Sequence, residues 1–235
     1  ELYTLPQIVS GSEPEAVERA GELFRLLTDK IVVTTPEEAE LAKLFTNTWR
    51  YIKFAAANQF YMIANSMGVD FDRVRAAITQ DYPRAIDLPG AGFAAGPCLL
   101  KDTMQLASSD NAFLLGHASM MVNEGLPMYV VDRMAERYPL HESVVGILGM
   151  SFKGGSDDIR SSLAYRLRRI LRARCVDVLC HDPHVTSDPR LSELSAVLEK
   201  ADLLVLGAPH PEYRGLQANQ PVVDIWNLLG RGVRI

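Results

Sequence analysis

The chain has 235 residues, 48% of them hydrophobic and 8% aromatic, and its 24 basic and 29 acidic side chains give a formal net charge of −5. This length and composition suit a folded chain with two hydrophobic cores of ordinary size. The acidic balance argues against nucleic acid or an anionic membrane surface as the main partner.

The cysteines and the apolar runs bear on where the protein works. The three cysteines have no framework spacing, which indicates a reducing compartment. The sequence carries no secretory signal, and its longest charge-free run, residues 54–69, is too short and too polar to span a membrane. We therefore expect a cytoplasmic protein.

The chain begins with a predicted strand and two predicted helices. Residues 5–9 form an extended apolar segment with nothing before it to pair with, and the chain lacks an initiator Met, so we expect it to start within a longer protein. The pattern predicts a helix over 14–28, with proline at its first position, and a short strand at 30–34. A capping box at 35–38 (Thr-Pro-Glu-Glu) then opens a long helix over 36–67.

The long helix changes character along its length. Its first half is charged, whereas its second half carries apolar side chains on several faces, so we expect the second half to be buried in a bundle that includes a second copy of the chain. Lys43 and Asn47 share one face of the charged half. On their own they are best explained as solvated polar groups. Beside a thiolate and a carboxylate, they would stabilise an oxyanion and hold a water molecule.

A loop of small residues delivers a cysteine to the start of a further helix. Residues 90–97 have almost no side-chain bulk, so their backbone can approach a ligand closely. Cys98 follows, where a helix N-terminus and Lys101 favour the thiolate form. Asp102 lies one turn later on the same face. The motif offers a nucleophile with an acid–base partner, and a buried structural cysteine is the alternative.

Two further helices surround this motif, and a polar segment ends the first half of the chain. Helices are predicted at 69–79 and 111–138, the latter either continuous or broken at the Gly-Leu-Pro of residues 125–127. Polar residues without periodicity follow. We place the domain border there, with a helical domain and its short extended N-terminal segment at 1–141 and a second domain at 142–235.

The second domain alternates between strands and helices. Apolar runs predict strands at 144–150, 176–180, 202–207 and 222–226, separated by helical patterns at 163–173 and 191–201. Such alternation is typical of a parallel sheet with helices on both faces, as in nucleotide-binding α/β domains. The loop at 151–162 follows the first strand and carries Lys153 and Arg160, so it is either a phosphate site or a solvated charged loop.

The remaining histidines and cysteines are interpreted as structural. Residues 181–184 (His-Asp-Pro-His) suggest a metal site, but no third ligand is spaced with them, so we expect no metal. Cys175 and Cys180 flank or lie in a predicted strand and are interpreted as core thiols.

Four motifs in this order resemble the UDP-glucose/GDP-mannose dehydrogenases, the nucleotide-sugar 6-dehydrogenases of polysaccharide biosynthesis. They are LPQIV at 5–9, ELAKLFTN at 40–47, the cysteine loop with its Lys-Asp pair, and FKGGSDDIRSS at 152–162. The family also has an N-terminal Rossmann domain that binds NAD, and this chain carries no G-x-G-x-x-G after a strand. The resemblance therefore implies an α/β protein with an all-helical central dimerisation domain and a Rossmann-like domain that binds a UDP-sugar.

The resemblance also implies a reaction. The C6 alcohol of the sugar is oxidised to a carboxylate with two NAD⁺, through a thiohemiacetal and then a thioester on Cys98. Lys43 and Asn47 match the residues that stabilise the oxyanion and position water, and Asp102 matches the carboxylate that assists proton transfer and thioester hydrolysis.

Binding residues follow from the same resemblance. Phe152 and Lys153 match positions that contact the nucleotide-sugar, and we expect Phe93 and Gly96 of the cysteine loop to contact it as well. Arg84 matches an arginine that reaches the partner's substrate across a homodimer formed through helix 36–67. Lys101 and Arg160 match residues that contact NAD.

The cysteine loop departs from the family pattern, which leaves the sugar open. Relatives commonly have Gly-Phe-Gly-Gly-Ser-Cys or Gly-Val-Gly-Gly-His-Cys, whereas residues 92–98 read Gly-Phe-Ala-Ala-Gly-Pro-Cys. Without the cofactor domain, we expect the isolated chain to bind a nucleotide-sugar weakly and to be inactive. The alternatives are a non-catalytic module for nucleotide-sugar binding and dimerisation, and a more distant relative in the 6-phosphogluconate dehydrogenase superfamily.

Overall fold

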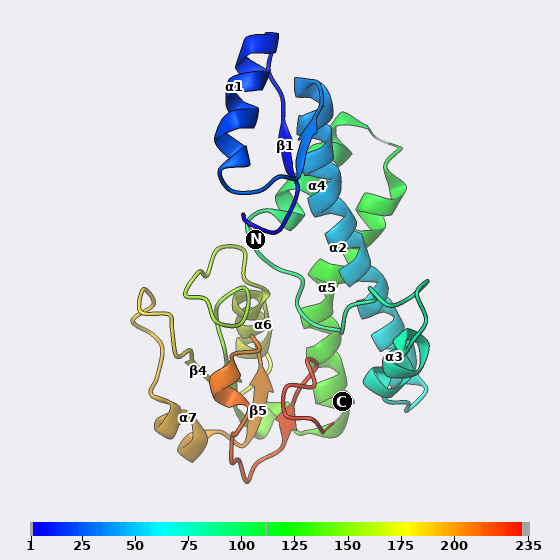
Figure 1. Cartoon of the computed structure of the whole chain (residues 1–235). Helices are drawn as coiled ribbons and strands as arrows, with labels where there is room; N and C mark the ends of the chain where they lie inside the picture. Colours follow the sequence, from blue (N-terminus) through cyan, green and yellow to red (C-terminus); the bar gives the residue numbers. More distant parts are fainter. Residues whose placement is uncertain (1, 111, 232–235) are drawn as a thin grey trace. The chain divides into compact units, whose positions relative to one another are not determined.

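A computed structural model describes residues 2–110 and 112–231. The chain divides into two compact units, Glu1–Trp49 and Arg50–Ile235. The border between the units lies within the long helix α2 (Pro36–Ser66), so this helix contributes its charged half to the first unit and its apolar half to the second (Figure 1). No helix in the described ranges combines the length and apolarity needed to cross a bilayer.

The first unit holds two short parallel strands joined by a helix. Strand β1 (Gln7–Val9) pairs with β2 (Ile31–Val33), and α1 (Pro14–Arg25) forms the crossover between them. The first strand thus pairs with a strand that follows it, because the helix between them brings the chain back to form a parallel pair. The start of α2 has the predicted capping box: the Thr35 amide donates to Glu38 at 2.9 Å, and the Glu38 amide donates to the Thr35 hydroxyl at 3.3 Å.

The helices of the second unit agree closely with the predicted ranges. They are the second half of α2, α3 (Phe71–Thr79), α4 (Leu99–Ser109) and α5 (Leu114–Arg137). Helix α5 runs without a break, although Pro127 lies inside it. The apolar half of α2 is covered on one side, where Tyr61 is fully buried, but Phe60 and Ile63 are 48% and 49% exposed. The described chain by itself therefore covers only part of this apolar surface.

A four-stranded parallel sheet follows the helices. Its strands are β3 (Val144–Leu148), β4 (Asp177–His181), β5 (Leu203–Leu206) and β6 (Val222–Val223), in the order β4-β3-β5-β6. Short 3₁₀ turns at Leu140–Glu142 and Pro211–Tyr213 lie before β3 and after β5. The parallel sheet is confirmed, although all four strands are shorter than, or shifted from, the apolar runs that predict them.

Helices cover both faces of this sheet. Helix α6 (Leu163–Arg172) shares one core with Leu203 and Val205 of β5, and α7 (Leu194–Lys200) shares a second core with Leu204 and Leu206. Alternate side chains of one strand thus enter opposite cores, as the period of a strand requires. The predicted fold class, helices followed by a Rossmann-like parallel sheet, is confirmed. The first of these cores also includes α5 residues such as Val130, so it crosses the border predicted at 141/142.

Candidate active site

A cavity of about 470 Å³ opens in the second unit beside the N-terminus of α4. Three stretches of chain form most of its wall: the start of the second half of α2, the cysteine loop and the loop after β3. Among the residues predicted from the sequence, six line it together: Phe93, Gly96, Cys98, Phe152, Lys153 and Arg160. The cavity also has lining residues that sequence reasoning did not single out: Arg50, Phe54, Asp158, Pro209 and Trp226.

Glycine at two positions lets the cysteine loop pass against aromatic rings. Gly92 and Gly96 have φ angles of +149° and +114°, which residues other than glycine rarely adopt. A Cβ on Gly92 would lie 2.1 Å from the Trp226 ring, and one on Gly96 would lie 2.8 Å from Phe152. The small residues of this loop therefore let its backbone pack closely against the aromatic rings that line the cavity.

A buried amide fixes the path of the same loop. Asn58 of α2 accepts from the Gly92 amide at 2.9 Å and donates to the Gly92 carbonyl at 3.0 Å. Its amide also donates to Asn123 of α5 at 2.9 Å, and both asparagines are fully buried. The sequence holds one signal for this residue, an amide within an uncharged helical run, but its partner is set only by the fold.

Cys98 is the N-cap residue of α4 and is exposed, with its side chain on the cavity. The Asp102 amide donates to the Cys98 carbonyl at 2.9 Å, so the two residues are one turn apart as predicted. Asp102 is fully buried, with a carboxylate oxygen 3.6 Å from the Nζ of Lys101, which is 68% exposed. Neither Asp102 nor Lys101 is among the described residues that line the cavity.

The loop after β3, residues 151–162, brings charge to the cavity. Lys153 Nζ lies 5.5 Å from the centre of the Phe152 ring. Arg160 makes a bidentate pair with Asp158, with Nη2 2.7 Å and Nε 3.0 Å from its carboxylate oxygens. The hydrogen bond from Arg160 lowers the pKa of Asp158, and the same bond raises the pKa of Arg160. Ser162 caps α6 by accepting from the Ala164 amide at 3.2 Å.

The other predicted site residues lie elsewhere in the described chain. Arg84 is exposed in the segment between α3 and the cysteine loop and does not line the cavity. Lys43 and Asn47 belong to the first unit, where both border a second cavity of about 430 Å³ together with Ile8. Their shared helix face is confirmed, and their place beside Cys98 stays a prediction.

The two other cysteines are structural in position. Cys180 of β4 is buried, and burial raises its pKa to about 11. Cys175 is partly buried against the same core, and burial raises its pKa as well. Both therefore remain thiols at neutral pH, in agreement with their interpretation as core residues.

Three side chains beyond the carboxyl ends of β4 and β5 are close enough together to bind one ion: His184, His210 and Glu212. They come from the loops after β4 and β5, which explains why spacing along the sequence does not reveal a third group near His184. Both ring nitrogens of His210 are engaged, since Nδ1 accepts from the Gly155 amide at 3.1 Å and Nε2 lies 3.0 Å from Asp182. An ion would have to displace one of these contacts, so we assign no metal here.

Two family models match the chain. The one described as the UDP-glucose/GDP-mannose dehydrogenase family, central domain, matches residues 37–124, and the one described as the UDP binding domain of the same family matches residues 146–231. The border predicted at 141/142 falls between these two ranges. The matched ranges include the cysteine loop and the charged loop that line the cavity.

Individual relatives agree with the family models. The chain is 30% identical over 243 residues to the UDP-N-acetyl-D-mannosamine dehydrogenase of Pyrococcus horikoshii, an alignment that covers 100% of this chain and 55% of that protein. It is also 30% identical to an NDP-N-acetyl-D-galactosaminuronic acid dehydrogenase of Ralstonia nicotianae, over 94% of this chain and 54% of that protein. A solved structure of the Pyrococcus horikoshii UDP-D-ManNAc dehydrogenase matches with a TM-score of 0.86 at 28% identity, over 97% of this chain and 57% of that one. The chain thus spans about half the length of these relatives.

Proposed function

Because the chain belongs to the UDP-glucose/GDP-mannose dehydrogenase family, we propose that it is the nucleophile-bearing and substrate-binding part of an NAD-dependent nucleotide-sugar 6-dehydrogenase. The observation that carries this proposal is the shared cavity. An exposed cysteine at the N-terminus of α4 lines the same space as Lys153 and Arg160 of the loop after β3. One end of the cavity therefore suits a reacting carbon and another suits a phosphate.

The composition of the cavity wall supports a nucleotide-sugar as ligand. Lys153, Arg160 and Arg50 bring three cations, against the single carboxylate of Asp158 among the described residues of the wall. This excess of positive charge favours a diphosphate. The rings of Phe152 and Trp226 offer flat apolar surface, and a volume of about 470 Å³ lies within the range of small-molecule sites. From the names of the relatives, we propose a UDP-linked N-acetylhexosamine as the substrate class, in preference to GDP-mannose.

The chemistry that we assign to Cys98 begins once C6 of the sugar is an aldehyde. NAD⁺, when bound, would accept one hydride from C6 in each of the two oxidation steps, so that two NAD⁺ are consumed over the whole reaction. The Cys98 thiolate adds to the aldehyde carbon, and the carbonyl oxygen becomes a thiohemiacetal oxygen. After C6 has been oxidised to a thioester, water attacks the carbonyl, the carbon–sulfur bond breaks, and the thiolate is released with a carboxylate and two protons, the first of which a base of the protein takes up.

Other residues of the chain would move protons and hold the reacting oxygens. We assign Lys43 and Asn47 to stabilising the oxyanion and positioning the water, and Asp102 to accepting the proton lost during thioester hydrolysis. Asp102 is buried one turn beyond Cys98, so it would act through Lys101 or a water molecule rather than by touching the substrate. Phe93 and Gly96 would shape the sugar end of the cavity.

The cofactor and the second subunit complete the proposal. Lys101 and Arg160 are exposed cations that suit the pyrophosphate of NAD, and we place the rest of the cofactor on a domain beyond this chain. We propose a cytoplasmic homodimer through helix 36–67, since the exposed apolar side chains of α2 need cover, with Arg84 reaching the partner's substrate. Light scattering tests the dimer: Ile63→Glu is expected to give a monomer, whereas Gln105→Glu, at an exposed position of α4 outside helix 36–67, is the control.

Thiol reactivity with and without nucleotide tests the central proposal on this chain. We expect iodoacetamide to modify Cys98 faster than an ordinary thiol, and UDP-N-acetylhexosamine to protect it, whereas GDP-mannose protects less. The alternative, a non-catalytic binding module, predicts that UDP-sugars bind while Cys98 reacts no faster than a free thiol. NAD reduction by this chain alone would contradict the expected inactivity of the isolated chain.

A further inference from the structure

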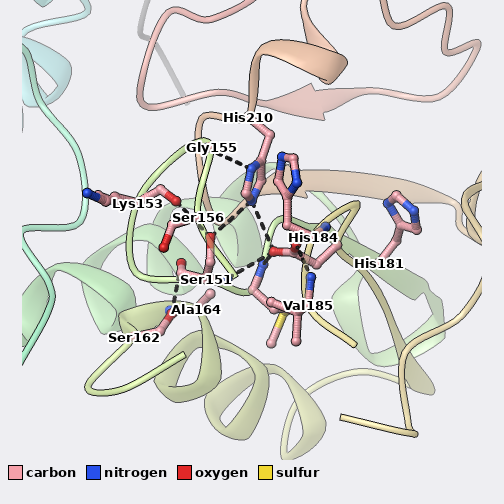
Figure 2. Close-up of polar contacts among 12 residues, drawn as sticks. Ser151, Lys153, Gly155, Ser156, Ser162, Ala164, His181, His184, Val185 and His210 are labelled. Carbon is pink, nitrogen blue, oxygen red and sulfur yellow. Dashed lines mark hydrogen bonds and ion pairs between the residues drawn. The ribbon is translucent and has the colours of Figure 1, made fainter. Parts of the chain in front are cut away.

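A buried polar cluster lies at the carboxyl ends of three neighbouring strands. Ser151 follows β3, Asp182 follows β4 and His210 follows β5. The sheet order β4-β3-β5 places Ser151 between the other two, and Figure 2 shows His210 facing both Ser151 and the loop that continues from it. Ser151, Asp182 and His210 are 1%, 7% and 0% exposed. None of the three lines the cavity, so the function proposed above does not use them.

Asp182 is the fixed member of the cluster. One carboxylate oxygen accepts from the amides of Met150 and Ser151 at 2.6 and 2.9 Å, and the other accepts from the amides of His184 and Val185 at 2.9 and 3.0 Å. Burial alone would raise the pKa of Asp182, but the hydrogen bonds from His210 and from these amides hold it well below its usual range. Asp182 is therefore an anion whose hydrogen bonds connect the residues that follow β3 with those that follow β4.

His210 extends this tie into the loop. Its Nδ1 accepts from the Gly155 amide at 3.1 Å, which assigns the ring proton to Nε2. Nε2 then donates to Asp182 at 3.0 Å and lies 3.0 Å from the Ser151 hydroxyl (Figure 2). The Ser151 hydroxyl in turn donates to the Lys153 carbonyl at 2.8 Å. One imidazole thus contacts the loop before and after Phe152 and Lys153.

The loop also packs closely against the segment that carries this histidine. A Cβ on Gly154 would lie 2.3 Å from the carbonyl oxygen of Pro209, the residue before His210. Pro209 itself lines the cavity. The amide of Phe152 donates to the Asp158 carbonyl at 2.9 Å, which closes the loop on its other side. The position of Phe152 and Lys153 is therefore set by contacts of the loop with Pro209 and Asp158 as well as with His210.

We propose that His210 is a positioning residue for the cavity, and that its two ring nitrogens hold residues 151–155 in the conformation that presents Phe152 and Lys153 to a ligand. The identity of that ligand as a nucleotide-sugar rests on the proposed function, but the order of the loop does not. A buried imidazole with one accepting and one donating nitrogen is used here as a fixed brace between strand ends. No other side chain in the described ranges contacts both Ser151 and Gly155 through hydrogen bonds.

Two half-replacements separate positioning from general packing. His210→Asn places an amide oxygen near the position of Nδ1, where it can accept from Gly155, whereas His210→Gln places an amide nitrogen near Nε2, where it can donate to Asp182. His210→Ala removes both contacts. Tyr213→Phe is the matched control, because Tyr213 packs against the His210 ring and its hydroxyl lies 2.9 Å from His181, whereas none of the hydrogen bonds among the described residues joins it to the loop.

The measurements are amide hydrogen exchange at Gly155 and the dissociation constant for UDP, both on the full 235-residue chain. We expect His210→Ala to speed exchange at Gly155 and to weaken UDP binding, each by about tenfold. His210→Asn is expected to restore both, and His210→Gln to restore neither in full. Tyr213→Phe is expected to lower the unfolding temperature and leave both readouts unchanged.

The outcomes that overturn the proposal are distinct from failure of the proposed function. Unchanged Gly155 exchange in a folded His210→Ala variant would overturn it, and so would a His210→Asn variant that behaves no better than His210→Gln. The comparison of these last two variants decides the matter even if His210→Ala does not fold. Absence of UDP binding in the wild-type chain, together with rapid Gly155 exchange in His210→Ala, would reject the nucleotide ligand and support the brace.

Discussion

The two loops that line the cavity are held in opposite ways. The cysteine loop is bound by one buried side chain, Asn58, and otherwise depends on having no side chain at Gly92 and Gly96, which pass against the rings of Trp226 and Phe152. The loop after β3 is held by the presence of side chains, chiefly Asp182 and His210, which reach it from neighbouring strands. A substitution in the first loop therefore acts by adding atoms, and a substitution around the second acts by removing hydrogen bonds.

The largest effect is expected at the end of the first loop. In a protein that joins this chain to the proposed NAD-binding domain, Cys98→Ser is expected to reduce the proposed carboxylate formation on the order of 10³-fold or more, because a hydroxyl is a much weaker nucleophile than a thiolate. Steady-state NADH formation measures this rate. UDP affinity is the control and should stay within about twofold of wild type. Full activity in Cys98→Ser would show that the cysteine is structural.

Adding one methyl group tests how the first loop is held. Gly92→Ala is expected to lower the free energy of unfolding by about 3 kcal/mol, because the new Cβ would overlap the Trp226 ring and the backbone has φ +149°. Gly90→Ala is the matched control, since a Cβ there meets nothing within 4 Å. Denaturant unfolding measures both variants. Equal stability of the two would mean that close packing does not fix this loop.

Removing one charge tests how the second loop is held. Asp182→Asn is expected to lower the free energy of unfolding by about 2–3 kcal/mol at pH 7, because a buried anion with several amide donors is lost. The wild-type carboxylate stays ionised in the folded state while the unfolded state takes up a proton below about pH 4, so this advantage is present at neutral pH and shrinks as the pH falls below that value.

Unfolding curves between pH 7 and pH 2 measure this difference. Asp157→Asn serves as the control, since Asp157 is exposed in the same loop and its replacement should change stability by less than about 0.5 kcal/mol. A constant difference between wild type and Asp182→Asn across the whole pH range would contradict the assigned ionisation.

The smallest effect is expected where the second loop meets the cavity. Asp158→Asn removes the carboxylate that pairs with Arg160 and leaves three cations on the wall. UDP affinity is expected to rise about threefold at low salt, and stability to stay close to that of the wild type, because solvent and salt screen the pair. Calorimetric titration measures the affinity. A loss of affinity beyond tenfold would show instead that Asp158 orients Arg160 for the ligand.

Structural features that depend on residues close together in the sequence can be predicted from it. Elements with their own signals were predicted well: the capping box at Thr35, the run of small residues before Cys98 and the alternation of strands and helices each act through neighbours in the sequence. Of the two possibilities left open for α5, the continuous helix is observed, because Pro127 costs one backbone hydrogen bond while its buried neighbours pack along the whole helix. Interactions between residues of one helix or loop therefore produce a sequence pattern that predicts them.

Features that depend on sheet order leave no such pattern. Ser151, Asp182 and His210 meet because β3 lies between β4 and β5, and a partner 28 or 59 residues away cannot be found by spacing. The partner of β1 was missed for a similar reason, since β2 follows a crossover helix. Arg50 and Trp226 line the cavity but lie far from the cysteine loop in the sequence, so local motifs do not predict their place in the site.

The packing of Trp226 also gives the cavity an optical reporter. Its indole donates to the Leu206 carbonyl at 3.2 Å and meets the Phe93 ring edge-on, whereas Trp49, the other tryptophan of the chain, is 55% exposed. Replacing Trp49 by Phe leaves Trp226, which lines the cavity, as the single tryptophan of the chain. Its emission then follows ligand entry without a label, and stopped-flow mixing turns the same signal into association and dissociation rates.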